Sequence, residues 1–317
     1  MSTLKTASMK SQEDRVPQAL ERLLVATDFS EHATEALRSA IELARAHDAE
    51  ILLVHAVDSE LPTLAAPDDP LGRFIRQNLG ALESLVRGSG VPVCAEIHLG
   101  KPWDVITKVA RESTVDLIIL GAQGKSRVSE RFLGTTADRV IKTSSVPVLV
   151  APKRPLSSAH DVQTILVATD FSEEAALATS MAVRLLHGCV TEGHLVLLHS
   201  VALSVKHIDA DVPMPIPEYW DAAERDAAQK LQTLAASLRN DRMTVEAKTF
   251  RGYPAETILS EARNCQADLI AMGTQGRKGL DRFFMGSVAE RVLHHADCPV
   301  LTVRRPEGDQ PIQLSAD

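Results

Sequence analysis

The chain has 317 residues, of which 44% are apolar, so it is long enough for two domains that each bury a core. Its 34 basic and 42 acidic residues give a net charge of −8, which argues against nucleic acid as a partner because a phosphate backbone requires a basic face. The 4 cysteines are widely spaced and contain no CxxC pair, which argues against a disulfide framework. Residues 1–20 lack the apolar core of a signal peptide and no apolar run is long enough to span a bilayer, so we expect a cytoplasmic protein without membrane insertion.

The first half of the chain alternates strand and helix patterns. Residues 22–27 form an apolar run with little alternation, which is typical of a parallel strand buried on both faces. Ser30 can cap the helix that follows, in which apolar residues recur at helical spacing as far as Ala44. Further strands are predicted at residues 51–57, 91–98, 115–120 and 146–150, and further helices at residues 71–87, from Pro102 onward and from Gly134 to about residue 143.

The second half repeats the first. Residues 25–31 recur unchanged as residues 167–173, and the Gly-x-Pro motif of residues 100–102 recurs at residues 252–254. Five strands joined by helical crossovers in each copy predict an α/β fold with two tandem Rossmann-like domains, each built on a five-stranded parallel sheet. The predicted order is a flexible N-terminal tail at residues 1–20, domain 1 at residues 21–152, a linker at residues 153–162, domain 2 at residues 163–305 and a C-terminal tail at residues 306–317.

A glycine motif follows the fourth predicted strand of each copy. Two glycines just past the strand allow a tight turn and a close approach to a ligand. After nine further residues, a third glycine and a hydroxyl residue begin a helix, whose N-terminal N–H groups and dipole suit a phosphate. The same spacing in both copies is a stronger indication of a site than either copy alone. The residues are Gly121, Gly124, Gly134 and Thr135 in the first copy, and Gly273, Gly276, Gly286 and Ser287 in the second.

An aspartate ends the first predicted strand of each copy. If the first and fourth strands are neighbours, Asp28 faces the loop at Gly121 and Asp170 faces the loop at Gly273, because ligands bind beyond the carboxyl ends of parallel strands. Such a carboxylate can accept hydrogen bonds from a ribose or an adenine amine, or help to hold a divalent cation. The alternative is that each aspartate is a turn or cap residue.

With these motifs, the chain resembles the universal stress protein family, and over residues 21–305 it resembles the tandem two-domain type. The resemblance implies a strand order of 3-2-1-4-5 in each domain, pairing of the two halves through their fifth strands, and the glycine spacing of the ATP-binding subgroup. Two departures are Gln123 and Gln275, where the family frequently has His, and Thr135-Thr136, where Ser-Val is more usual. Adenine and ribose contacts are implied for Ala26, Thr27, Asp28 and the backbone of Ala56, and for Ala168, Thr169, Asp170 and Ser200. Ribose and phosphate contacts are implied for Gly121, Gln123, Gly124, Gly134, Thr135 and Thr136, and for Gly273, Gln275, Gly276, Gly286, Ser287 and Val288.

Motifs and resemblance together predict an ATP-binding, nucleotide-dependent sensor or regulator of the stress response, with one ATP site per domain. Magnesium is expected only with the ATP, near Asp28 and Asp170, and no metal is expected to be held by protein side chains alone. We name no catalytic residue and expect binding rather than catalysis. A homodimer of whole chains and an unidentified regulatory protein partner are further expectations.

Two alternatives stay open at this point. One is a slow ATP hydrolase, for which the sequence offers no identified base to activate water beyond Asp28 or Asp170. The other is a nucleotide-independent scaffold that binds a protein or a lipid-like ligand through residues 202–220. That segment contains three prolines with Tyr219 and Trp220, and it fits either a lid or partner surface or an insertion without regular structure.

Overall fold

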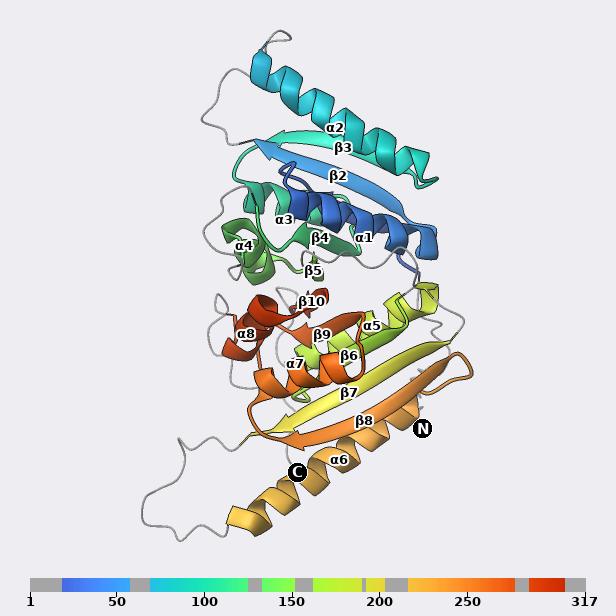
Figure 1. The fold of residues 1–317 in the computed structure, drawn as a ribbon, viewed down its shortest axis with the longest axis vertical. Coiled ribbons are helices and arrows are strands. Elements are labelled where there is room, and N and C mark those ends of the chain that lie inside the picture. Colours follow the sequence, from blue (N-terminus) through green and yellow to red (C-terminus); the bar gives the residue numbers. More distant parts are fainter. Residues whose placement is uncertain are drawn as a thin grey trace, which may run out of the picture.

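The computed structural model describes residues 19–57, 69–124, 133–151, 162–189, 192–202, 216–276 and 285–305. The expected tails and linker, and the nine-residue spacers of the glycine motifs, lie wholly or largely outside these residues. Strands β1 to β10 form one sheet, in the order β3-β2-β1-β4-β5-β10-β9-β6-β7-β8. Figure 1 shows α2 at one end of the molecule and α6 at the other, with β5 and β10 between them.

Each half has the strand order 3-2-1-4-5 with all neighbours parallel, as predicted. In the first half, for example, Leu24 of β1 lies opposite Leu52 of β2 and Ile118 of β4. The elements of that half are β1 (Arg22–Ala26), α1 (Glu31–His47), β2 (Glu50–Val57), α2 (Pro70–Gly88), β3 (Val93–Leu99), α3 (Pro102–Glu112), β4 (Leu117–Gly121), α4 (Thr135–Thr143) and β5 (Val148–Ala151). Those of the second half are β6 (Thr164–Ala168), α5 (Glu173–Cys189), β7 (Gly193–Val201), α6 (Ile216–Leu238), β8 (Met243–Arg251), α7 (Pro254–Asn264), β9 (Leu269–Gly273), α8 (Ser287–His295) and β10 (Val300–Val303).

Both faces of the sheet carry an apolar core. Helices α1, α2, α5 and α6 cover one face, where Leu23 and Val25 point, and α3, α4, α7 and α8 cover the other, where Leu24 points. All three of these β1 side chains are fully buried. A strand that is buried on both faces has no side chains exposed to solvent, which explains the continuous apolar run in the sequence.

The two halves join through antiparallel pairing of β5 with β10, as the resemblance implies. Leu149 lies opposite Leu301, and the Thr302 hydroxyl donates a hydrogen bond of 3.2 Å to the Val148 carbonyl across the junction. Hydrogen bonding therefore continues from one half into the other, and the outer strands of the whole sheet are β3 and β8.

One expectation about the segment at residues 202–220 is wrong in part. Residues 216–220 are the beginning of the long helix α6, and Pro217 stands in its first turn, where proline is tolerated because the N–H groups have no intrahelical partner. Residues 203–215 lie outside the described residues. Among the helices that the structure describes, none is long and apolar enough to cross a membrane.

A second contact between the halves lies where α1 meets α5. The Leu20 N–H donates to Nδ1 of His47 at 3.3 Å, and the imidazole packs so closely on Gly188 that a Cβ there would lie 2.2 Å from its atoms. Burial is the main cause that lowers the pKa of His47 below its ordinary value. The ring is therefore held neutral between the two halves.

An ion pair accompanies this contact. The Arg184 guanidinium of α5 donates to Oδ1 of Asp116 at 2.9 Å, while Oδ2 accepts the N–H groups of Glu21 and Arg22 at 2.8 and 3.1 Å. Burial alone would raise the pKa of the Asp116 carboxyl, but these hydrogen bonds hold it below its ordinary value. Asp268 repeats the backbone contacts in the second half, with N–H groups of Gln163 and Thr164 at 2.9 and 2.8 Å.

We expect the free energy of unfolding to fall as the pH drops below about 6.5, the ordinary pKa of histidine. Because the pKa of His47 is lowered in the fold, the unfolded chain takes up the proton first, and the stabilisation present above pH 6.5 is lost as the pH falls towards the folded pKa. Urea unfolding of the wild-type chain and of His47→Gln between pH 8 and pH 5 measures this contribution. A wild-type pH dependence identical to that of His47→Gln would contradict it.

Candidate functional site

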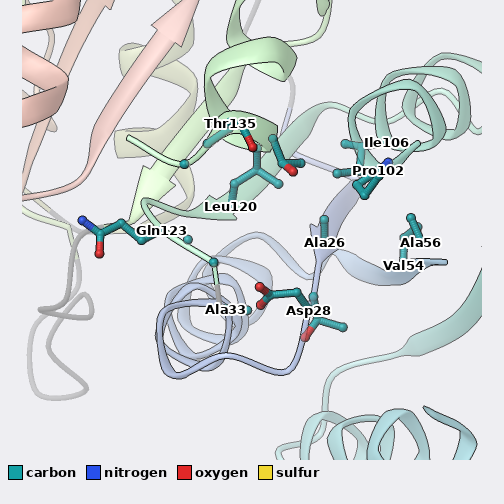
Figure 2. Close-up of a pocket in the computed structure, with 16 residues that line it drawn as sticks. Ala26, Asp28, Ala33, Val54, Ala56, Pro102, Ile106, Leu120, Gln123 and Thr135 are labelled. Atoms are coloured by element: carbon teal, nitrogen blue, oxygen red, sulfur yellow. The ribbon is translucent and has the colours of Figure 1, made fainter. Parts of the chain in front are cut away.

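A pocket of about 370 Å³ lies at the carboxyl ends of the central strands of the first half. Figure 2 shows Val54, Ala56, Pro102 and Ile106 on one side of it, with the Gln123 side chain extending away on the opposite side. Every residue predicted for the first site lines this pocket: Ala26, Thr27, Asp28, Ala56, Gly121, Gln123, Gly124, Gly134, Thr135 and Thr136.

The second half has a matching pocket of about 480 Å³. Its position relative to β6, β7 and β9 is equivalent to that of the first pocket relative to β1, β2 and β4. Every residue predicted for the second site lines it: Ala168, Thr169, Asp170, Ser200, Gly273, Gln275, Gly276, Gly286, Ser287 and Val288.

A strained turn presents the aspartate of each pocket. After β1 the chain reverses through Phe29 at φ 63°, a left-handed conformation that is uncommon for a bulky residue. Three side-chain oxygens stabilise the turn: Thr27 Oγ1 accepts the Phe29 N–H at 3.0 Å, Asp28 Oδ1 accepts the Ser30 N–H at 2.9 Å, and Ser30 Oγ accepts the Ala33 N–H at 3.2 Å. The predicted Ser30 cap of α1 is confirmed, and one oxygen of Asp28 is a turn acceptor.

The second half builds the same turn with the same residues. Phe171 also has φ 63°, and the hydrogen bonds to Thr169 Oγ1, Asp170 Oδ1 and Ser172 Oγ measure 3.0, 3.0 and 3.3 Å. Residues 25–31 and 167–173 are identical in sequence, and the turn hydrogen bonds give a structural reason for this identity. The turn leaves Oδ2 of each aspartate to face the glycine loop.

A histidine beside each turn stabilises it: His55, which is buried, in the first half and His199, which is partly buried, in the second. His55 Nδ1 lies 2.7 Å from the Thr27 carbonyl, to which it donates, and its ring stacks on Phe29 with centroids 4.4 Å apart. His199 makes the same contacts with the Thr169 carbonyl at 2.7 Å and with Phe171 at 4.7 Å. Sequence reasoning did not include these histidines in the site; their equivalent positions in the two copies were the available signal.

Close packing explains the first two glycines of each motif. A Cβ on Gly121 would lie 2.7 Å from the His32 backbone, and a Cβ on Gly124 would lie 2.7 Å from Asp28 Oδ2. The corresponding distances are 2.8 Å from Gly273 to the Glu174 Cβ and 3.0 Å from Gly276 to Asp170 Oδ2. Among the described glycines, positive φ occurs only at Gly90, Gly100 and Gly252, so the motif glycines are explained by close approach rather than by a left-handed backbone.

The third glycine begins a helix that points into the pocket, as predicted. Gly134 is the N-cap of α4, has no side chain to cap it, and donates its own N–H to the Ala122 carbonyl at 2.8 Å. Thr135, Thr136 and Ala137 of the first turn line the pocket. Gly286 has the same role for α8 in the second half, with its N–H 2.8 Å from the Thr274 carbonyl. The positive end of a helix dipole therefore faces each pocket.

The apolar wall comes mostly from residues that the sequence did not assign to the site; Ala56 is the exception in the first half. The wall consists of Pro102 and Ile106 of α3 together with Val54 and Ala56 of β2. The equivalent wall of the second half consists of Pro254, Ile258 and Leu198, and Ser200 takes the place of Ala56. The repeated Gly-x-Pro motif was the signal for it, because Gly100 and Gly252, at φ 140° and 149°, turn the chain from β3 and β8 into these helices.

Side chains suited to hold a metal ion do not cluster in either pocket. Within the described residues, no group of three or more His, Cys, Asp or Glu is arranged as a metal site. Each pocket does have one carboxylate beside a helix N-terminus, which fits a ligand with hydroxyl groups at one end and anionic groups at the other. The apolar wall fits a flat, weakly polar ring between them.

The sequence profile described as the universal stress protein family matches residues 19–152 and again residues 161–304. The chain belongs to the universal stress protein family. Universal stress protein E of Salmonella typhi is 23% identical to it over 316 residues, which span 93% of this chain and 97% of that protein. A universal stress protein of Mycolicibacterium smegmatis is 28% identical over 301 residues, which span 89% of this chain and 96% of that protein.

A solved structure has the same tandem fold. The crystal structure of a universal stress protein from Archaeoglobus fulgidus superposes with a TM-score of 0.69, covers 90% of this chain and 98% of its own, and is 21% identical in sequence. Relatives of the same length and the same fold place this chain in the two-domain type of the universal stress protein family.

We expect Gly100→Ala to lower the free energy of unfolding by about 1–3 kcal/mol. At φ 140° an L-residue is strained, and the new Cβ would lie 3.1 Å from Val105 Cγ2 at the start of α3. Gly80→Ala is the matched control, because Gly80 lies inside α2, where an added methyl group would have no atom within 4 Å, and it should gain about 0.5–1 kcal/mol. Urea unfolding of both variants measures the difference; equal effects would contradict the strain at Gly100.

Proposed function

We propose that this universal stress protein binds ATP in each of its two pockets and acts as a nucleotide-dependent sensor or regulator rather than as an enzyme. The observation that carries the proposal is that one arrangement is built twice, with an apolar wall, an aspartate turn and an uncapped helix N-terminus around each pocket. The proposal keeps the domain limits 21–152 and 163–305. A cytoplasmic location, a homodimer of whole chains and an unidentified regulatory partner belong to the same proposal.

The apolar wall supports adenine as the base. A purine ring buries two flat faces, and Pro102 and Ile106 of α3 with Val54 and Ala56 of β2 offer apolar surfaces for them in the first pocket. Ala26 and Thr27 place the end of β1 beside this wall, where main-chain groups can pair with the edge of the base. The second pocket offers Pro254 and Ile258 for the same purpose.

The aspartate and the helix support a ribose followed by phosphates. Oδ2 of Asp28 lies over Gly124, on the path from the apolar wall to the N-terminus of α4, where it can accept a ribose hydroxyl or approach a magnesium ion. Gly134 leaves room at that N-terminus, since a Cβ added there would have no neighbour closer than 3.5 Å. Phosphate oxygens there would meet main-chain N–H groups and the positive end of the dipole.

A binding role is favoured over hydrolysis by what the pockets lack. Of the described residues that line them, Asp28, Asp170 and His199 are the ones with an acidic or imidazole side chain. Each is already used in the turn, through Oδ1 of either aspartate or Nδ1 of His199. If the chain were a hydrolase, purified protein with Mg-ATP would release phosphate steadily and Asp170→Ala would stop it; we expect ATP to remain intact over hours.

Equilibrium dialysis should find about two ATP per chain. We expect Gly134→Val and Gly286→Val each to weaken one site roughly 30-fold or more, because a side chain then fills the space at the helix N-terminus. The double variant should lose both sites. Gly80→Ala, a glycine change in α2 far from the pocket lining, is the control and should keep both.

Thermal melting of each variant without nucleotide tests whether it is folded. Full stoichiometry in both folded single variants would contradict the proposed position of the phosphates. Absence of binding in the wild-type chain would contradict the proposal as a whole and favour the nucleotide-independent scaffold.

A further inference from the structure

The two pockets differ in one charged residue that touches the glycine loop. The second residue of α5 is Glu174, whereas the second residue of α1 is His32. Glu174 Oε2 accepts the N–H of Gln275 at 2.7 Å and the hydroxyl of Thr274 at 3.2 Å, and Oε1 accepts the N–H of Arg305 at 3.3 Å. The carboxylate is therefore tied to the loop that follows β9.

This loop carries the groups proposed to bind phosphate. Thr274 and Gln275 line the second pocket, and Gln275 directly precedes Gly276. The Thr274 carbonyl accepts the N–H of Gly286, the N-cap of α8, at 2.8 Å. One residue thus joins the Glu174 carboxylate on one side to the helix N-terminus on the other.

At the equivalent helix position the first half has a histidine in place of the glutamate. His32 stands where Glu174 stands, and Ala122, which has no hydroxyl, stands where Thr274 stands. The glutamine, the three glycines and the aspartate turn are otherwise the same in both halves. Among the described residues, the two loops therefore differ in their contact with the Glu174 carboxylate.

We propose that Glu174 is a specificity-determining residue that reduces the preference of the second pocket for triphosphate over adenosine, relative to the first pocket. This inference rests on the proposed function, since it concerns the same phosphate groups. Each added phosphate brings negative charge towards a carboxylate that the fold holds in place, so the repulsion grows with the number of phosphates. Adenosine has no phosphate, so this repulsion does not affect its binding. Glu174 acts through the loop and the field it creates, without lining the pocket.

Glu174→Gln tests the charge while keeping an oxygen that can accept the Gln275 N–H. In the Gly134→Val background, where only the second pocket fills, calorimetric titration should give ATP binding roughly tenfold tighter and adenosine binding changed less than about twofold. Glu173→Gln is the matched control: it removes the same charge one residue away, where the half-exposed Glu173 pairs with the Arg305 side chain at 3.1 Å, and it should leave the ratio of ATP to adenosine affinity unchanged within about twofold.

The reverse change belongs in the first pocket. His32→Glu in the Gly286→Val background should lower the ratio of ATP to adenosine affinity roughly tenfold. A Glu174→Gln variant in which ATP and adenosine affinities move by the same factor, or not at all, would overturn the inference while leaving nucleotide binding in place. If neither ATP nor adenosine binds to the wild-type chain, the proposed function fails and this inference fails with it.

Discussion

Backbone pairing between β1 and β4 is the interaction on which the first pocket depends. Leu24 and Ile118 are distant in sequence, yet their strands lie side by side and parallel. Because β2 and β3 lie on the far side of β1, and β5 on the far side of β4, the crossovers leave the two strand ends in opposite directions. The turn at Asp28 and the loop at Gly121 therefore face each other across a gap that no crossover covers, which is where ligands bind in open parallel sheets.

The loop after β4 approaches the turn after β1 so closely that few residue types fit at the contact positions. The loop after β4 lies against the N-terminus of α1 and against the Asp28 carboxylate at distances that exclude even a methyl group at Gly121 and Gly124. The turn itself is held by three side-chain hydrogen bonds and by His55. The second half repeats these turn contacts, so the identity of residues 25–31 and 167–173 reflects the requirements of this turn.

The pairing of β5 with β10 fixes the position of the two halves relative to each other. The pairing is antiparallel, and His47 and the Arg184–Asp116 pair add a second contact on the helical layer. Asp116 also holds the start of β1 through two main-chain N–H groups, so the contact between halves reaches the strand whose other end carries Asp28. The two pockets differ within this shared fold at single positions, such as Glu174 in the second half where the first half has His32.

Local patterns in the sequence predict the strands and the glycine motifs, and the resemblance adds the strand order and the remaining residues proposed for the two pockets. The local patterns rest on short-range signals: apolar runs, the Ser30 cap, and glycines at fixed spacing. The contact of Glu174 with Thr274 joins residues 100 positions apart, and that of Arg184 with Asp116 joins residues 68 positions apart; neither leaves a local pattern in a single sequence. The packing of Gly121 against His32 and of Gly124 against Asp28 was missed likewise, because it joins segments that are distant in the sequence.

The most direct measurement is a crystal structure of the chain grown with a non-hydrolysable ATP analogue and magnesium. Our proposal predicts one analogue in each pocket, with adenine between Pro102 and Val54 or between Pro254 and Leu198, and phosphates at the N-termini of α4 and α8. Two empty pockets at saturating analogue, or an analogue bound elsewhere on the chain, would contradict it.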